Sequence, residues 1–288
     1  MSYRVIQELA AERNWPVQSL CRILEVSRAG YYRWLNRISS SSEIENRFLL
    51  EEITKIHHQV KKIYGYRRMT LQVNKNLGTK YNQKRIRRIM RIGGYFSKIR
   101  RPRPSWQRSN PFHLSENILN REFDAATAPN QIWCTDVTEF KYGQRKKLFL
   151  SAVIDLYDKS IVSYQLSDSN DNPIVLNTIE SAFEEQPQAK PLIHSDRGFQ
   201  YTSIGYKRLK ERYQFTTSMS RVSKCLDNQP IESFWGVLKS ECFYLGTYSD
   251  KDSLIKDIKD YIHFYNNKRV VIKYDGLAPL EYRYQTIT

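Results

Sequence analysis

Apolar residues recur with helical spacing through the first part of the chain. The pattern predicts amphipathic helices at 5–12, 17–24, 28–37, 44–60, 66–77 and 82–92. Ser27 is a residue type favoured just before a helix, and the layout around it is that of a helix-turn-helix, although many small helical bundles share it. A serine-rich stretch at 39–42 separates this unit, 1–40, from a second helical unit, 43–98. We therefore expect two small all-α units.

The pattern changes to alternating strands and helices after a segment at 99–128 that is rich in proline and arginine. Three closely spaced strands predict an antiparallel meander at 130–140, 146–158 and 160–166. Helices and short strands then alternate up to a helix at 228–241, which predicts an α/β domain over 129–245. The remainder, 246–288, is expected to be one more amphipathic helix at 251–267 and a basic tail.

Composition narrows the class of protein. Apolar residues make up 40% and aromatic residues 13%, so the chain of 288 residues is globular and not disordered throughout. The longest apolar stretch, 148–154, is too short to span a membrane, and the N-terminus lacks the features of a secretory signal. The four cysteines lie far apart without a C-x-x-C pair, which excludes a disulfide scaffold or structural zinc site. We expect a cytosolic protein with reduced thiols.

Positive charge is concentrated in one block. The formal net charge is +16, yet residues 53–115 contain 17 Lys and Arg and no acidic residue, while the rest of the chain has 29 basic against 30 acidic residues. Such a block repels itself unless it meets a polyanion, and nucleic acid is the commonest such partner. A solvated basic face or a disordered arm is the alternative, but apolar periodicity inside the block disfavours the arm.

The predicted helix at 82–92 has an apolar stripe and an opposite face almost entirely of Lys and Arg, which suits it to a DNA groove. We expect contacts with DNA from basic residues of the block, namely Arg67, Arg68, Lys84, Arg85, Arg87, Arg88, Arg91, Arg100 and Arg101.

Three acidic residues stand at positions where carboxylates need an explanation. Asp136 lies mid-strand among apolar neighbours, Asp196 follows a short strand, and Glu232 lies in the first turn of a helix. Each has an ordinary alternative: an exposed edge-strand residue, a turn residue, and a residue stabilised by the helix dipole. On a helical wheel Glu232 shares one flank with Asn228 and Lys239, beside an apolar stripe.

The order and spacing of the three acids, and the motifs around them, favour a functional role over these ordinary alternatives. Three acids on a strand, after a later strand and on a later helix, with 35 residues between the last two, resemble the DDE polynucleotidyl transferases of the retroviral-integrase superfamily. Surrounding motifs resemble the second-frame (OrfB) transposases of the insertion-sequence-three group over nearly the whole chain; they are WCTDVTEF, LIHSDRGFQYTS, SMSR, DNQPIESFWGVLKSE, YGYRRM, YNNKRV and GLAPLEYR.

The resemblance implies a ribonuclease H-like catalytic core, a mixed sheet with helices, preceded by small helix-turn-helix DNA-binding units. It also implies that Asp136, Asp196 and Glu232 bind metal, with Asp136 bridging two Mg²⁺ or Mn²⁺ ions and the other acids holding one each. Lys239 and Asn228 would lie at the DNA near the active site. No nucleotide cofactor is implied.

The function that follows is metal-dependent cleavage and strand transfer at the ends of a bacterial insertion sequence. Its partners would be double-stranded DNA of the terminal inverted repeats and of the target, a second copy of the chain, and an upstream-frame product with a helix-turn-helix and a coiled coil. A nucleoid-associated cytoplasmic location follows. Two alternatives stay open: a non-catalytic DNA-binding repressor of the element, and a ribonuclease H-like nuclease that only hydrolyses.

Overall fold

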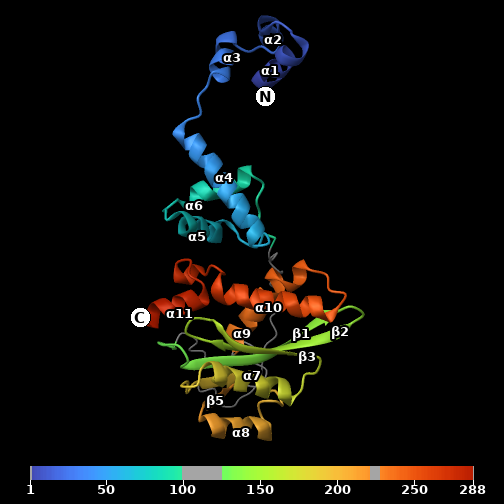
Figure 1. Ribbon diagram of the computed structural model, residues 1–288, viewed down its shortest axis with the longest axis vertical. Helices are drawn as coiled ribbons and strands as arrows, with labels where there is room; N and C mark the ends of the chain where they lie inside the picture. Colours follow the sequence, from blue (N-terminus) through green and yellow to red (C-terminus); the bar gives the residue numbers. More distant parts are fainter. Residues whose placement is uncertain (1, 99–124, 221–227, 288) are drawn as a thin grey trace, which may run out of the picture. The chain divides into compact units, whose positions relative to one another are not determined.

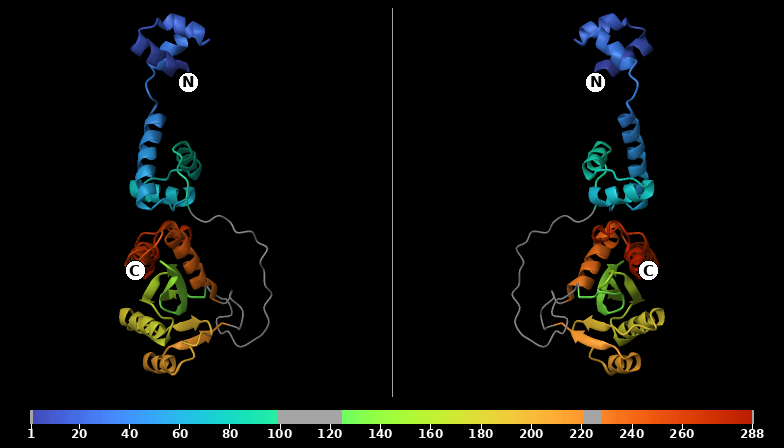
Figure 2. Two further views of the ribbon diagram at one scale, coloured as in Figure 1. Left: turned by 90° about the vertical axis from the view of Figure 1, so that its right-hand side faces the viewer. Right: turned by 90° about the vertical axis from the view of Figure 1, so that its left-hand side faces the viewer.

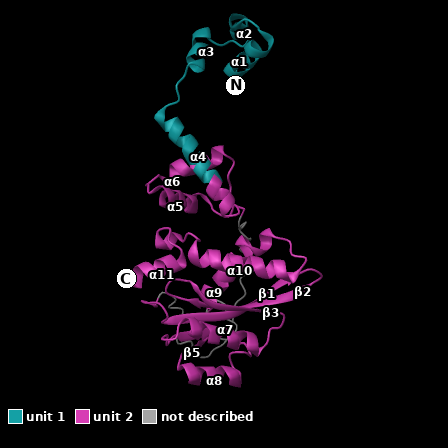
Figure 3. Ribbon diagram, viewed as in Figure 1, with its two compact units in different colours: residues 1–54 teal, residues 55–288 magenta. Residues whose placement is uncertain are grey.

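The computed structural model describes residues 2–98, 125–220 and 228–287. The chain divides into two compact units, residues 1–54 and 55–288 (Figure 3). Most of the segment expected as a linker, including Arg100 and Arg101, lies outside the described residues.

The first unit is helical, as predicted. It begins with the helices α1 (Ser2–Arg13), α2 (Val17–Ile23) and α3 (Arg28–Leu35), and its end at Thr54 falls within the next helix. The Ser27 side chain accepts a hydrogen bond from the backbone N–H of Gly30 and so caps α3. A small apolar cluster holds the three helices together; its buried members are Ile6, Leu20, Cys21 and Tyr31.

Three helices cover the second predicted helical stretch: α4 (Ser41–Gln59), α5 (Tyr66–Leu77) and α6 (Gln83–Ile92). The Asn82 side chain caps α6 by accepting the backbone N–H of Lys84, and Gly94 follows the helix with a φ of +71°. On α6 the apolar stripe is buried while the cations of the opposite face are exposed, so the predicted amphipathic pattern is confirmed.

One mixed sheet organises the second unit. Its strands are β1 (Ile132–Tyr142), β2 (Lys146–Asp155), β3 (Ile161–Ser167), β4 (Leu192–Ser195) and β5 (Thr216–Met219), in the order β3-β2-β1-β4-β5. The first three strands form the predicted antiparallel meander, and β4 and β5 add to it in parallel. Parallel additions require crossover connections, which the intervening helices supply.

Helices cover both faces of this sheet. Helices α7 (Asn172–Glu185) and α8 (Ile204–Tyr213) lie on one face, and α9 (Gln229–Glu241) and α10 (Lys251–Asn267) lie on the other (Figures 1 and 2). Two apolar clusters result, one on each side of β1, because successive side chains of a strand point to opposite faces. The predicted fold class, an α/β core with a mixed sheet preceded by all-α units, is confirmed.

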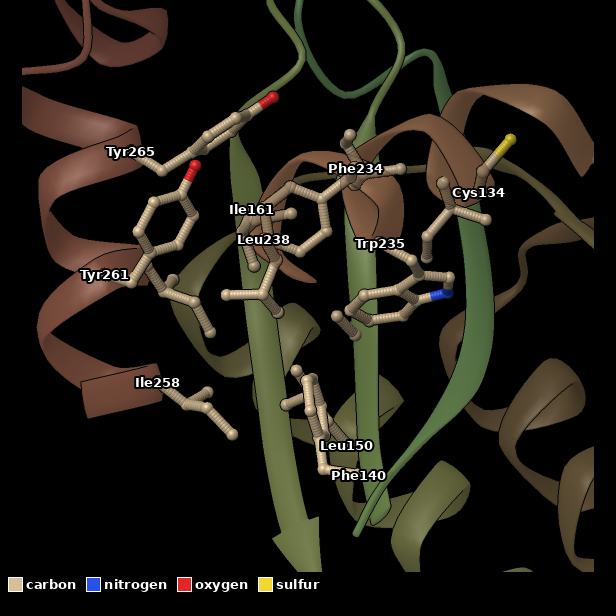
Figure 4. Packing of buried hydrophobic residues seen from close by; sticks show 14 of the residues in the cluster. Cys134, Phe140, Leu150, Ile161, Phe234, Trp235, Leu238, Ile258, Tyr261 and Tyr265 are labelled. Carbon is tan, nitrogen blue, oxygen red and sulfur yellow. The ribbon is translucent and has the colours of Figure 1, made fainter. Parts of the chain in front are cut away.

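Aromatic residues dominate the cluster on the α9 and α10 side. Phe234 and Trp235 of α9 pack between the sheet and α10, next to Tyr261 and Tyr265 (Figure 4). The face of α9 that the sequence predicts to be buried is therefore the face on the sheet.

The end of the chain differs from the expected basic tail. After α10 the chain forms the short 3-10 helix η3 (Ile272–Tyr274) and then helix α11 (Pro279–Ile287). Arg283 of α11 is buried and forms ion pairs with Asp155 and Asp158, which are fully buried. The sequence predicts a basic tail here and not a helix, because a buried, ion-paired arginine cannot be distinguished from an exposed arginine in the sequence.

Among the described helices, none is both long enough and apolar enough to cross a membrane. Cys21, Cys134 and Cys242 are free thiols, as expected; the fourth cysteine lies outside the described residues.

The ion pairs of Arg283 generate a stability prediction. Replacing Arg283 with Leu leaves two buried carboxylates without their cation, so we expect the free energy of unfolding to fall by about 3–5 kcal/mol. Urea unfolding measures this. As the control, Arg212→Leu removes an exposed pair with Glu180 and should cost less than about 1 kcal/mol. Equal, small losses in both variants would contradict a structural role for Arg283.

Candidate active site

Strand register places Asp136 and Asp196 at the same level of the sheet. In the parallel pair of β1 and β4, Cys134 lies opposite His194. Asp136, within β1, and Asp196, just after the end of β4, each follow two residues later, so the two residues lie at the same level of the sheet, beyond the carboxyl end of β4. The carboxyl ends of parallel strands are where ligand sites form in α/β folds.

Helix α9 brings the third acid to this edge. The Trp235 indole N–H donates a hydrogen bond of 3.0 Å to Oδ2 of Asp136. Glu232 lies three residues before Trp235 on the same helix, a spacing that places both on neighbouring positions of one face. At the start of α9 the buried Asn228 side-chain amide donates to the carbonyl oxygen of Thr135, next to Asp136.

The negative charges of Asp196 and Glu232 act on Asp136. The pKa of Asp136 is raised to about 6, chiefly by burial and to a smaller extent by the negative charges of Asp196 and Glu232, against hydrogen bonds from Trp235 and the Val137 backbone that lower it. Burial also raises the pKa of Glu232. Asp136 is thus a half-buried carboxyl in a negative field, while Asp196 and Glu232 are exposed.

A tight turn orients Asp196. Its Oδ1 accepts the backbone N–H of Gly198 at 2.8 Å. A Cβ atom at position 198 would lie 2.9 Å from Asp196 Oδ1 and 2.9 Å from Gln200 Oε1, which is closer than carbon and oxygen approach. Only glycine therefore allows this carboxylate position.

Lys239 approaches the site from the same helix. Its ammonium group lies 5.3 Å from the centre of the Phe140 ring, and burial lowers its pKa, partly offset by the charges of Glu139 and Asp136. The predicted flank of α9 therefore gathers Asn228, Glu232 and Lys239 around β1, with Asn228 buried instead of on an exposed rim.

The side chains at the site have the donor types that suit a divalent metal ion. Carboxylate oxygens are the hard donors that Mg²⁺ and Mn²⁺ prefer, and the pKa of Asp136 is raised chiefly by burial and in smaller part by the neighbouring negative charges, which a cation would offset. Within the described ranges, however, no group of three His, Cys, Asp or Glu side chains is close enough to hold a metal ion. The donor types fit, but the side chains must approach one another further to enclose an ion.

Most of the predicted DNA contacts gather on α6. Lys84, Arg87, Arg88 and Arg91 are exposed and line a hollow of about 620 Å³. Arg87 lies over the Tyr66 ring of α5 with its guanidinium carbon 5.2 Å from the ring centre. Two further predicted contacts also lie beside aromatic rings, Arg85 at Tyr81 and the exposed Arg67 at Tyr66.

Arg68 has a different environment from the other predicted DNA contacts. Its side chain is 23% exposed and donates a hydrogen bond of 3.0 Å to the buried carboxylate of Glu241 on α9. We therefore correct the interpretation of Arg68: its guanidinium belongs to an internal ion pair and not to the exposed basic face.

Two residues that orient the acids were missed from sequence. The Trp235 indole N–H is the donor to Asp136. A tryptophan three positions after a candidate acid is a usable signal, since a buried indole usually finds an acceptor. The close contact of Gly198 with Asp196 depends on coordinates that no sequence spacing reveals.

Trp235 generates a prediction about the ionisation of Asp136. Replacing Trp235 with Phe keeps the ring but removes the donor, so we expect the pKa of Asp136 to rise above about 6 in the metal-free protein. Carbon-13 NMR titration of the Asp136 carboxyl measures this. The matched control, Trp133→Phe, removes an indole hydrogen bond to Asn130 instead. An unchanged pKa in Trp235→Phe would contradict the assigned hydrogen bond.

The pKa change has a consequence for stability. An acid whose pKa is higher in the folded state than in the unfolded state loses stabilisation as pH rises between the two values. For Asp136 this window runs from the ordinary value of 3.8 to about 6, and in Trp235→Phe its upper limit should move to higher pH.

Comparison with known proteins agrees with this architecture. Family models for an integrase core domain match residues 126–225 and 232–287, and a model for an HTH-like domain matches residues 43–103. The InsK protein of insertion sequence element IS150 from Escherichia coli K12 is 37% identical over 98% of both chains. A transposase-like protein of Haemophilus influenzae is 37% identical over 76% of this chain and all of that one.

More distant similarity extends in the same direction. Transposase InsF of insertion sequence IS3A from Escherichia coli K12 is 28% identical over 98% of both chains. The solved catalytic core domain of HTLV-2 integrase, a complex with magnesium, is 19% identical over 55% of this chain and 98% of that one, with a TM-score of 0.45, which is too low to add to the assignment. The sequence matches decide it: the chain belongs to the insertion-sequence transposases that carry an integrase core domain.

Proposed function

We propose that this transposase cleaves DNA strands at the ends of its insertion sequence and joins them to new sites, with Asp136, Asp196 and Glu232 as the catalytic, metal-binding acids. One observation supports this best. The register of β1 and β4 sets the two aspartates level, and the hydrogen bond from Trp235 to Asp136 brings the helix of Glu232 to the same edge.

The chemistry is in-line displacement at phosphorus. Two bound Mg²⁺ or Mn²⁺ ions would offset charge on the phosphate and on the attacking and leaving oxygens. The attacking oxygen belongs to water when a 3′ end is exposed, and to that 3′-hydroxyl when the end is joined to another strand. By resemblance to the family, Asp136, Asp196 and Glu232 would together hold the ions.

The other residues of the site act by position and charge. Trp235 and Asn228 fasten α9 to β1 on either side of Glu232. Lys239 would place its ammonium group against a DNA phosphate near the acids, where partial burial strengthens the attraction. By resemblance to the family, Asn228 would lie close to the DNA, with its own amide buried and donating to the Thr135 carbonyl oxygen.

The exposed face of α6 would hold the terminal inverted repeat. Its guanidinium and ammonium groups can contact phosphates on both sides of a groove. Joining two ends to a target requires at least a second copy of the chain, and an upstream-frame product with a further helix-turn-helix would assist. Such a complex would assemble on the bacterial nucleoid in the cytoplasm.

The acids generate the first functional prediction. Changing Asp136 or Asp196 to Asn, or Glu232 to Gln, removes a metal-binding charge at nearly constant shape, so cleavage and joining of end DNA in Mg²⁺ should fall at least about a hundredfold. Affinity for the same DNA should stay within about twofold, because the basic face of α6 is unchanged. Gel assays of cleavage, joining and end-binding measure the three quantities.

The control is Glu180→Gln, an acid of α7 that pairs with Arg212. It should keep both activities. Full joining by a triad variant would refute the assignment of that acid, and release of 3′ ends by the wild type without joining would identify a nuclease that only hydrolyses.

The basic face of α6 generates the second functional prediction. Because each phosphate contact releases counterions, the slope of log affinity against log salt should become shallower by about 0.9 in Arg87→Gln and in Arg88→Gln. Fluorescence anisotropy of end DNA at several salt concentrations measures the slope. Lys207→Gln on α8 removes the same charge elsewhere and should leave the slope unchanged. A flat salt dependence of the wild type would exclude phosphate contacts by α6.

A further inference from the structure

A buried carboxylate at the end of α9 accepts four hydrogen bonds from three directions. Glu241 is 5% exposed and is the last residue of the helix that carries Glu232. Arg269 donates from Nε to Oε2 at 2.8 Å and from a terminal nitrogen to Oε1 at 2.7 Å. Tyr261 donates to Oε2 at 2.8 Å and Arg68 to Oε1 at 3.0 Å.

These four donors fill the lone-pair positions of the carboxylate. Burial alone would raise the pKa of Glu241, but the bonds and charges of Arg269, Arg68 and Tyr261 hold the pKa below its usual value. The group is therefore an ionised acceptor with a fixed geometry, since a bidentate arginine constrains direction as well as distance. A carboxylate held in this way cannot follow one partner without straining the others.

A second contact joins the same parts of the chain. The fully buried Tyr64 accepts the backbone N–H of Val270 at 2.9 Å, and the guanidinium of Arg68 lies 5.9 Å from the centre of the Tyr64 ring. In the middle of α5, Leu71 lies close to Gly276, where an added Cβ atom would be 3.2 Å from the Leu71 Cβ. Helix α5 thus rests on α9 and on the segment after α10 through buried groups.

Helix α9 makes this contact relevant to the active site. Glu232 and Glu241 lie nine residues apart on one helix, which corresponds to about 14 Å along its axis. Helix α5 packs on α6, which carries the exposed basic face. A continuous series of contacts therefore connects the face proposed to hold DNA with Glu232. Helix α6 packs on α5, Arg68 of α5 pairs with Glu241, and Glu241 and Glu232 lie on the same helix, α9.

We propose that Arg68 is a positioning residue that sets the register between DNA held on α6 and the acids at the sheet edge, and so determines which phosphate is cleaved. This inference rests on the proposed function. Arg68 contacts neither the exposed cations of α6 nor the three acids proposed to be catalytic. Its replacement should therefore change the position of cleavage and not the affinity for DNA.

The test compares variants of the full chain on a duplex that carries the terminal sequence of the element. Arg68→Gln removes the charge yet leaves Glu241 paired with Arg269 and Tyr261, so the fold should persist. We expect end affinity within about twofold of wild type and a fall of about tenfold in the ratio of cleavage at the correct phosphate to cleavage at its neighbours, the size expected for one charge-assisted hydrogen bond. Arg68→Lys should restore part of this ratio.

Two controls separate positioning from other effects. Arg67→Gln, on the same helix but exposed, should weaken end-binding and keep the cleavage position. Lys75→Gln removes an exposed ion pair between α5 and Glu281, which is weak, and should change neither quantity.

The outcomes are distinguishable. A wild-type protein that does not cleave end DNA defeats the proposed function itself. If the wild type cleaves at one position and Arg68→Gln cleaves at the same position with the same selectivity, the positioning role is refuted. If Arg68→Gln loses affinity for end DNA and keeps the cleavage position, Arg68 contacts the DNA itself and the positioning role is refuted.

Discussion

The hydrogen bond from Trp235 to Asp136 is the contact on which the arrangement of the site depends. A carboxyl buried beside two other acids tends to become neutral, and a neutral carboxyl is a poor ligand for a divalent cation. The indole N–H opposes this change and, in the same contact, fastens α9 to β1. One side chain therefore both favours ionisation of Asp136 and, together with Asn228, holds the helix that carries Glu232 in place.

Local patterning predicted much of this architecture, because periodicity and capping act over a few residues. The helix of α5 and the cap at Ser27 follow from spacing and from side-chain chemistry alone, and the alternation in β1 placed Asp136 on the face of its apolar neighbours, which α9 covers. The three acids were found through the motifs around them, and the register of β1 and β4 then explained why residues 60 apart, Asp136 and Asp196, share one edge.

The roles of the arginines could not be predicted in the same way. Arg68, Arg269 and Arg283 contribute to the count of positive charge as Arg87 does, but each is paired inside the fold with a buried acid. Sequence separations between these partners exceed 100 residues for Arg68 and Arg283, so no local pattern connects them. Helix α11 was not predicted for the same reason, because it is anchored by ion pairs with Asp155 and Asp158, which lie far earlier in the chain.

This sorting of charges has a consequence for DNA recognition. The opposite charges of an interior ion pair largely cancel each other's field. The exposed positive charges of α6 therefore make the main contribution to the electrostatic potential that a DNA duplex meets near α5. Long-range attraction by α6 is weakened by salt, whereas the buried bonds around Glu241 are shielded from it. DNA affinity and the position of cleavage can therefore respond differently to ionic strength. Affinity comes from surface charges that salt screens, whereas the position of cleavage comes from packed, fully hydrogen-bonded groups.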